Sequence, residues 1–343
     1  MKFLLFPFSL LYAWVSGLRN HLYDLGIWKS VEFDVNVIVV GNLQVGGAGK
    51  SPMVEYLIKL LQNRSKNPAI LSRGYKRKTR GFRLAGNEDT PQTLGDEPFQ
   101  FWKKYNGKVP IAVGEERVMA IPEIVFAHET CDTVVCDDAF QHRPLRSGLS
   151  LMLSTYSRPF FNDHVLPMGL LREQRKGASR ANAVIFTKCE SASTLDTEEY
   201  KKRTFKYVSS DTPVFFTRTV YQKPLSIFGS NIEISKSIVL VTGLANSEFL
   251  KNYVADSYDL KDHLDYSDHH NYSKKDVNAI VRKYELLKDA SNPVSILTTE
   301  KDAVKLRMFD ELQDMPVFYL PIEIEFIGDG DKFEALIMNS FAD

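Results

Sequence analysis

Residues 37–51 read VIVVGNLQVGGAGKS, and this stretch decides the fold. The four apolar residues at its start predict a buried strand. The segment that follows opens with Pro52, which suits the first turn of a helix, and then carries apolar residues at helical spacing. A strand, a glycine-rich turn and a helix in this order predict a phosphate-binding loop, because successive backbone N–H groups and a helix N-terminus attract an anion.

The loop departs from the standard pattern G-x-x-x-x-G-K-[ST], because Gln44 stands where the first glycine is expected. A glycine-rich turn without a ligand is the alternative interpretation. The dimerising P-loop ATPases place a second lysine before the two glycines, and Val45 in that position disfavours this class. The remaining residues keep every donor that ATP and Mg²⁺ need, and we predict phosphate binding by Gly46, Gly47, Ala48, Gly49, Lys50 and Ser51, with the Ser51 hydroxyl also on the metal.

Composition limits the possible partners. The chain has 343 residues, with 43 basic and 43 acidic side chains, so no global positive charge favours nucleic acid. Its three cysteines show no metal-binding spacing and suit a reducing compartment. The length predicts two domains.

The N-terminus is apolar. Residues 3–18 read FLLFPFSLLYAWVSGL and carry no charge, but the run is shorter than the ~20 residues of a spanning helix. Ser9, Tyr12 and Ser16 recur at helical spacing as a weakly polar stripe. We therefore expect residues 1–26 to form a helix at a membrane interface, in contact with membrane lipid. A secretory signal peptide and a plain buried helix are the alternatives.

The pattern of strands predicts the domain organisation. We expect residues 27–210 to form an α/β domain with a P-loop NTPase-like doubly wound sheet, with further buried strands at 69–72, 111–113, 133–136, 149–153 and 183–186. An extended linker at 211–235 would lead to a second, smaller α/β domain at 236–320. A cleft between two such domains is a favoured place for ligands. We expect the C-terminal segment 321–343 to pack back on the first domain.

Two acidic motifs accompany the loop. Residues 133–143 read TVVCDDAFQHR, and apolar residues that run into Asp137 and Asp138 match a Walker B strand, although a solvated acidic turn is possible. Neighbouring strand residues point to opposite faces, so one carboxylate should serve the Mg²⁺ and the other should position the loop. Asp96, in GDEP, is either a helix N-cap or a catalytic carboxylate near the phosphates.

Histidines and cations supply further candidates. Residues 267–270 read SDHH, which suits acid/base catalysis or a simple polar turn. Arg172 belongs to a cationic cluster after residue 165, and Arg73 follows a predicted strand. Such cations commonly meet a phosphate or another anionic group, although a solvated helix face explains the cluster equally well.

Together these motifs resemble a known family. GNLQVGGAGKSP, SRGYKRK, GDEP, VGEER, DDAFQHR, LPMGLLRE, VTGLAN, SDHH and TTEKDAVKL occur in the same order as in the tetraacyldisaccharide 4′-kinases, the lipid A 4′-kinases of Gram-negative bacteria. The resemblance implies a peripheral enzyme on the cytoplasmic face of the inner membrane. It would use ATP and Mg²⁺ to phosphorylate the 4′-hydroxyl of an acylated glucosamine disaccharide 1-phosphate, giving lipid IV-A. Neither nucleic acid nor a protein partner is expected.

The resemblance also implies roles for single residues. Asp96 and His269 would form a catalytic dyad, with His269 preferred to His270 because it directly follows Asp268. The metal shell would consist of Ser51, Asp137, Asp138 and Glu173, and the candidates for binding the substrate or another anion are Arg73, Arg117, Gln141, His142 and Arg172. The alternative function is a membrane-tethered P-loop ATPase switch that binds a protein partner.

Overall fold

The structure is a computed structural model that describes residues 5–189, 195–229, 232–268, 270–289 and 292–341. The chain forms two compact units. Unit 1 comprises Met1–Val220 and Ile324–Asp343, and unit 2 comprises Tyr221–Glu323. The extended linker expected at 211–235 differs from the structure in its first part, because strand β8 (Val214–Tyr221) is a member of the large sheet and is buried from Val214 to Thr217.

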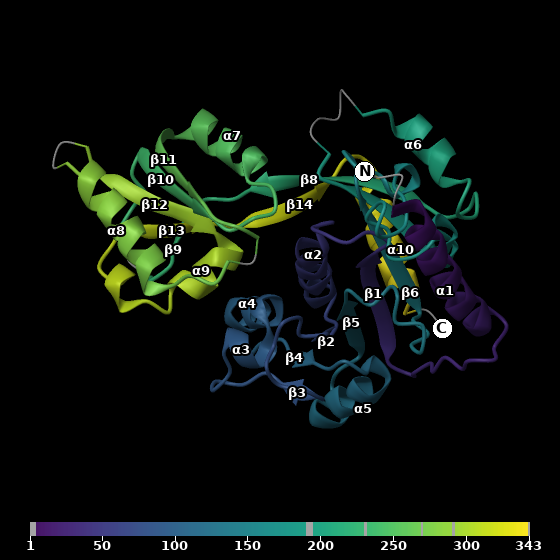
Figure 1. The fold of residues 1–343 in the computed structure, drawn as a ribbon. Coiled ribbons are helices and arrows are strands. Elements are labelled where there is room, and N and C mark those ends of the chain that lie inside the picture. Colours follow the sequence, from purple (N-terminus) through teal and green to yellow (C-terminus); the bar gives the residue numbers. More distant parts are fainter. Residues whose placement is uncertain (1–4, 190–194, 230–231, 269, 290–291, 342–343) are drawn as a thin grey trace. The chain divides into compact units, whose positions relative to one another are not determined.

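The described part of unit 1 forms one nine-stranded sheet in the order β14-β8-β7-β6-β1-β5-β2-β4-β3. Neighbouring strands from β8 to β4 pair in parallel, and β3 pairs antiparallel with β4 (Figure 1). The strands besides β8 are β1 (Asn36–Asn42), β2 (Pro68–Ser72), β3 (Arg83–Leu84), β4 (Ile111–Val113), β5 (Thr133–Asp137), β6 (Leu149–Thr155), β7 (Ala183–Thr187) and β14 (Ile322–Phe326). All six predicted strands of this sheet are confirmed, and their long apolar runs reflect burial on both faces.

Helices cover both faces of this sheet. Along β1, Val37 and Val39 point into one core and Ile38 and Val40 into the other. The first core includes side chains of α5 (Arg117–Ala127) and α6 (Thr197–Thr204), and the second those of α2 (Lys50–Asn63), α4 (Asp96–Tyr105) and α10 (Gly330–Asn339). A short helix, α3 (Pro91–Leu94), precedes α4. The predicted doubly wound α/β fold is therefore confirmed.

Helix α1 (Phe6–Asp24) packs on the rest of unit 1 through polar groups. The buried Ser9 hydroxyl accepts a hydrogen bond from the Met168 backbone N–H at 2.9 Å, and the Gln174 side chain donates to the Ala13 carbonyl at 3.1 Å. The opposite side is apolar and exposed: Phe6, Phe8, Leu10, Leu11, Tyr12, Trp14, Val15 and Leu18. Among the described residues no helix has the length and apolar character needed to cross a membrane.

Unit 2 has its own sheet in the order β11-β10-β12-β13-β9, with parallel pairs except between β13 and β9. Helix α7 (Glu248–Ser257) packs in one core of this unit, and α8 (Lys274–Leu287) and α9 (Glu300–Leu306) pack in the other. The chain passes from β10 through α7 to β11 on one side, and then through α8 to β12 on the other side of β10. The strands are β9 (Leu225–Ser226), β10 (Ser237–Thr242), β11 (Asp259–Asp265), β12 (Val294–Thr299) and β13 (Val317–Leu320).

Candidate active site

The predicted phosphate loop connects β1 to α2. Gly46 has φ +116°, and Gly49, directly before the helix, has φ +79°. Residues other than glycine rarely adopt these backbone conformations. Gln44, the departure from the standard pattern, is buried, and its side chain donates to Asp163 Oδ2 at 2.9 Å. This hydrogen bond fixes the start of the loop, which a glycine at position 44 could not do because it has no side chain.

Lys50 and Ser51 begin α2 and face carboxylates from two other elements. Lys50 Nζ lies 3.6 Å from Asp138 Oδ1 and donates to Asn42 Oδ1 at 3.3 Å. The Ser51 hydroxyl donates to Glu97 Oε1 at 3.2 Å. The loop thus collects one ammonium, one hydroxyl and acidic oxygens at the carboxyl ends of β1 and β5, the edge where open α/β sheets bind ligands.

Asp137 ends β5 as a buried carboxylate. Its Oδ2 accepts a hydrogen bond from the Ser72 hydroxyl at 3.3 Å, whereas Oδ1 has no hydrogen-bond partner within the described residues. Burial, with the negative charges of Glu97 and Asp138, raises the pKa of Asp137 to about 7. A buried carboxylate with an unused oxygen has the chemistry of a cation ligand.

Asp138 has the opposite environment. Both terminal guanidinium nitrogens of Arg172 donate hydrogen bonds to the Asp138 carboxylate, at 3.0 Å to Oδ1 and 3.1 Å to Oδ2. Burial alone would raise the pKa of Asp138, but the positive charges of Lys50 and Arg172 outweigh burial and hold this pKa below its usual value. The two neighbouring aspartates therefore differ in electrostatic character. Asp138 follows the end of β5 and has φ +48°, so the expectation that both lie on the strand and alternate between its faces is wrong, and the difference comes from the charges around each carboxylate.

The turn after β5 crosses β1 at a position that only glycine permits. A Cβ on Gly41 would lie 2.5 Å from Phe140 Cβ and 2.9 Å from the Phe140 backbone nitrogen. This close approach sets the path of the DDAFQHR segment above the end of β1.

Glu173 lies at the back of this site. It is 3% exposed, and its carboxylate accepts hydrogen bonds from Arg180 at 2.7 Å, Gln141 at 3.1 Å and Asn20 of α1 at 2.5 Å. Gln141 also accepts from Arg172 at 3.3 Å, so it links Glu173 to the Asp138 pair. Within the described part of the chain no three His, Cys, Asp or Glu side chains gather closely enough to hold an ion.

The other anion-binding candidates have unequal exposure. Arg117 is 2% exposed and donates to the backbone carbonyls of Gly114 and Asp137, so it holds the ends of β4 and β5 together. His142 Nε2 is buried without a hydrogen-bond partner in the described residues. Burial, with the positive charges of Arg117, Arg19 and Arg73, lowers the pKa of His142 to about 4. The imidazole is therefore neutral near pH 7, and Arg73 is the exposed one of the three arginines whose charges act on it.

The two proposed catalytic residues belong to different units. Asp96 is the first residue of α4 in unit 1, after Gly95, so it is not the N-cap that the alternative interpretation predicted. His269 belongs to unit 2 and lies outside the described residues. His270 is described, and its Nε2 lies 3.1 Å from Asp276 Oδ2.

Sequence reasoning missed Asn42, Glu97 and Asn20. Glu97 stands beside Asp96 in GDEP, and Asn42 stands in GNLQ, so their motifs contained them. Asn20 carried no signal, because its partner Glu173 is distant in the sequence and only the fold brings the two together.

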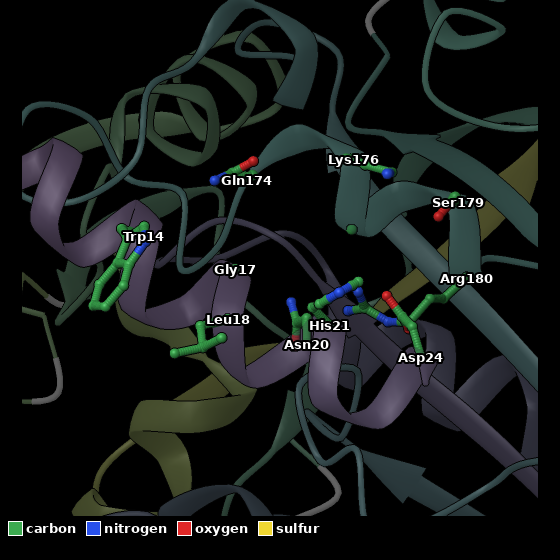
Figure 2. A pocket seen from close by; sticks show the side chains of 11 residues that line it. Trp14, Gly17, Leu18, Asn20, His21, Asp24, Gln174, Lys176, Ser179 and Arg180 are labelled. Atoms are coloured by element: carbon green, nitrogen blue, oxygen red, sulfur yellow. The ribbon is translucent and has the colours of Figure 1, made fainter. Parts of the chain in front are cut away.

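A pocket of about 380 Å³ opens between α1 and residues 174–180 (Figure 2). Figure 2 shows Trp14, Leu18 and Asn20 on the α1 side, and Gln174, Lys176, Ser179 and Arg180 on the other. The pocket therefore combines apolar and cationic side chains beside the exposed face of α1.

Comparison with known proteins identifies the family. Residues 1–342 match the family model described as tetraacyldisaccharide-1-P 4′-kinase. The chain belongs to this family. It is therefore a kinase, and the resemblance carried by its motifs is confirmed.

Relatives of this kinase match over nearly their whole length. A tetraacyldisaccharide 4′-kinase of Flavobacterium psychrophilum is 40% identical over 98% of this chain and 95% of the relative, and that of Flavobacterium johnsoniae is 38% identical over 98% and 96%. The crystal structure of the "apo" form of LpxK from Aquifex aeolicus in complex with ATP is similar with a TM-score of 0.76 and 28% identity, covering 99% of both chains.

Proposed function

We propose that this kinase transfers the γ-phosphoryl group of ATP to the 4′-hydroxyl of tetraacyldisaccharide 1-phosphate and forms lipid IV-A. The observation that carries the proposal is the phosphate loop whose Lys50 lies between Asn42 and Asp138, in a chain of this family. The Aquifex relative, described in complex with ATP, supports ATP as the donor. Backbone amides of Gly46–Ser51 and the Lys50 ammonium would hold the β- and γ-phosphates and neutralise charge that develops during transfer.

The residues present fit a magnesium ion. Mg²⁺ prefers oxygen ligands, and the buried Asp137 Oδ1 without a hydrogen-bond partner among the described residues, together with the Ser51 hydroxyl, supplies them. Ser51, Asp137 and Asp138 would hold the ion, which would offset negative charge on the phosphates. Glu173 completes the proposed shell, and for direct contact its carboxylate must exchange the hydrogen bond from Arg180 for the metal.

We propose that Asp96 and His269 remove the proton from the attacking hydroxyl. A solvated aspartate, with a pKa near ~3.9, is a weak base at neutral pH, so an imidazole partner with a pKa near ~6.5 would make proton transfer effective. Such base catalysis contributes on the order of 10²–10⁴ in rate, and alignment of the hydroxyl with the γ-phosphorus contributes much of the rest.

The acceptor is an acylated lipid, and α1 supports its delivery from a membrane. This helix binds the protein through Ser9 and Asn20 and turns its large apolar side chains outward, the reverse of a helix that packs into a core. We propose that this face lies in the cytoplasmic leaflet of the inner membrane, with the protein peripheral to it. The adjoining pocket with Trp14, Lys176 and Arg180 would receive part of the sugar phosphate.

The test is incubation of the purified protein with γ-labelled ATP and tetraacyldisaccharide 1-phosphate. We expect label on the lipid, a loss of about 10²-fold or more for Lys50→Ala, and wild-type activity for the control Lys59→Ala, which changes an exposed lysine of the same helix. Label that never reaches the lipid, or full activity in Lys50→Ala, would refute the proposal.

The alternative is a membrane-tethered ATPase switch that binds a protein partner. It predicts ATP hydrolysis whose rate does not depend on the lipid. Comparing phosphate release with and without the acylated acceptor separates the two functions, because the kinase transfers label to the lipid in proportion to ATP consumed.

A further inference from the structure

The segment LPMGLLRE at residues 166–173 carries part of the family resemblance, and the proposed chemistry uses only its last two residues. The backbone of this segment runs beside the phosphate loop. The Val45 N–H donates to the Leu170 carbonyl at 2.8 Å, and the Arg172 N–H donates to the Leu43 carbonyl at 2.7 Å. These two hydrogen bonds join the segment to the start of the loop, so the path of the loop depends on the position of this segment.

Asp163 lies just before this segment and has none of the roles proposed above. Its side chain is 3% exposed. Oδ1 accepts hydrogen bonds from the backbone N–H groups of His164 at 2.9 Å and Leu170 at 3.3 Å, and also from Arg158 at 3.0 Å. Oδ2 accepts one from the Gln44 side chain at 2.9 Å. One buried carboxylate thus binds both the segment and the residue that replaces the usual first glycine of the phosphate loop.

The environment of Asp163 keeps its carboxylate charged. Burial alone would raise the pKa of Asp163, but the hydrogen bonds from Gln44, Arg158 and two backbone N–H groups outweigh burial and hold this pKa below its usual value. The segment approaches the carboxylate closely at Gly169, where a Cβ would lie 2.5 Å from Asp163 Oδ1. A charged acceptor makes stronger hydrogen bonds than a neutral one, so Asp163 is suited to hold these groups in place.

A chain of hydrogen bonds connects Asp163 to the lysine that follows the phosphate loop. The Gln44 side chain donates to Asp163, and the Gln44 backbone carbonyl accepts a hydrogen bond from the Asn42 amide at 2.6 Å. Asn42 Oδ1 accepts a hydrogen bond from the Lys50 ammonium at 3.3 Å. The position of the Lys50 ammonium therefore depends, through two intermediate residues, on the carboxylate of Asp163.

A second connection leads from Asp163 to Arg172. The Asp163 carboxylate binds the backbone N–H of Leu170, two residues before Arg172. The Arg172 guanidinium donates to both oxygens of Asp138, and Lys50 Nζ lies 3.6 Å from Oδ1 of the same carboxylate. The two cations that meet at Asp138 are thus both connected to one buried carboxylate.

We infer that Asp163 is a positioning residue for ATP, which binds Gln44 and the residues before Arg172 and thereby sets the positions of the two cations. The inference rests on the proposed function, in which the Lys50 ammonium holds the β- and γ-phosphates. It also explains why glutamine can replace the first glycine of the standard pattern, since Gln44 supplies an N–H group that the buried carboxylate binds. Misplacing a group at a site by about 1 Å can cost on the order of 10²-fold in rate, so loss of this connection should be measurable.

The test is the affinity of the full-length kinase for ATP with Mg²⁺, measured by isothermal titration calorimetry. Gln44→Gly restores the standard pattern G-x-x-x-x-G-K-S, so the motif alone predicts equal or stronger binding. Because the substitution removes the connection to Asp163, we expect the Kd for ATP to rise about 10-fold instead.

Asp163→Asn tests the other end of the same hydrogen bond. It keeps the size of the side chain, but its amide nitrogen cannot accept a hydrogen bond, and we expect the Kd for ATP to rise about 10-fold or more. The double variant with Gln44→Gly should bind ATP no more weakly than Asp163→Asn alone, because both substitutions break one connection.

A matched control separates positioning from general stability. Asp89 is another buried aspartate of unit 1, and its carboxylate binds Arg83, Thr93 and the Gly86 N–H. Asp89→Asn should lower Tm as Asp163→Asn does, but it should leave the Kd for ATP within about twofold of wild type. In the lipid phosphorylation assay, only Asp163→Asn should raise KM for ATP, and neither variant should change KM for the lipid.

Three results would overturn the inference: wild-type affinity for ATP in both Gln44→Gly and Asp163→Asn, an equal loss of affinity in Asp89→Asn, or losses that multiply in the double variant. If Asp163→Asn fails to fold, Gln44→Gly decides the outcome, because it removes only one of the four hydrogen bonds to the carboxylate. If wild type binds ATP but never labels the lipid, the proposed function is refuted, whereas the ATP affinities still decide the role of Asp163.

Discussion

The buried Asp137 carboxylate should destabilise the metal-free protein, and its replacement by asparagine should make the fold more stable while it abolishes catalysis. Burial and neighbouring negative charge raise the pKa of Asp137 from 3.8 to about 7. A raised acid pKa means that the folded state retains a proton that the unfolded chain releases. Stability contributed by this group is therefore lost as pH rises from about 4 to about 7, and it stays low above that window.

The size of the effect follows from the shift. A difference of about three pKa units, at about 1.4 kcal/mol per unit, corresponds to about 4 kcal/mol at pH 8 and to almost nothing at pH 4. Asp137→Asn has no proton to exchange. Its advantage over wild type in free energy of unfolding should therefore grow with pH by up to this amount.

Urea denaturation followed by tryptophan fluorescence measures this difference. All three tryptophans lie in unit 1 with Asp137, so the signal reports on the relevant unit: Trp14, Trp28 and Trp102. Saturating Mg²⁺ with ATP should reduce this difference in free energy of unfolding, because the proposed ion site includes the wild-type carboxylate and the variant should bind the ion more weakly. The reasoning would be refuted if the difference in free energy of unfolding between Asp137→Asn and wild type were the same at pH 5 and pH 8, or if the variant were less stable than wild type at pH 8.

Two further substitutions test other features. Gly41→Ala should lower stability by roughly 2–3 kcal/mol, measured as a fall in Tm, because its methyl group would overlap Phe140 at 2.5 Å. The double variant Phe8→Ser and Trp14→Ser should lose binding to anionic lipid vesicles in co-sedimentation, because it removes two large side chains from the exposed face of α1, and ATP binding should be unaffected.

Each of these substitutions has a matched control. Gly86→Ala adds the same methyl group where its nearest heavy atom would be 4.0 Å away, so Tm should stay near wild type. Phe126→Ser removes an exposed phenylalanine of α5 and should leave vesicle binding intact. Equal Tm values for the two alanine variants, or equal vesicle binding by the double variant and wild type, would contradict these expectations.

The sequence predicted the elements of the sheet well because each strand of a parallel sheet is buried on both faces and reads as an unbroken apolar run. It also predicted the glycine-rich turn between β1 and α2, because the residues of this turn are contiguous. It did not place β8 in the large sheet, since a strand and an extended linker share the same local pattern. The residues of an extended segment alone do not show whether it will pair with a neighbouring strand.

The candidate site divides in the same way. Lys50 and Asp137 could be proposed from the sequence because their motifs are short and each residue type has one evident chemistry. The fork of Arg172 on Asp138 and the hydrogen bond of Asn20 to Glu173 join segments far apart in the chain, so only the folded structure reveals them. The different pKa shifts of the two aspartates likewise depend on burial and on charges that come from other elements.

The path of the chain between its two units has an architectural consequence. It leaves unit 1 along β8 and returns along β14, and these strands are neighbours, with the Ile327 N–H donating to the Phe216 carbonyl and Gln222 N–H to the Pro321 carbonyl, at 2.8 and 2.9 Å. Unit 2 is thus an insertion between two adjacent strands whose ends a tight hairpin could join. A shortened gene with such a turn would still encode every strand of the nucleotide-binding sheet. Unit 2 could therefore be removed by joining the chain at one place, between β8 and β14.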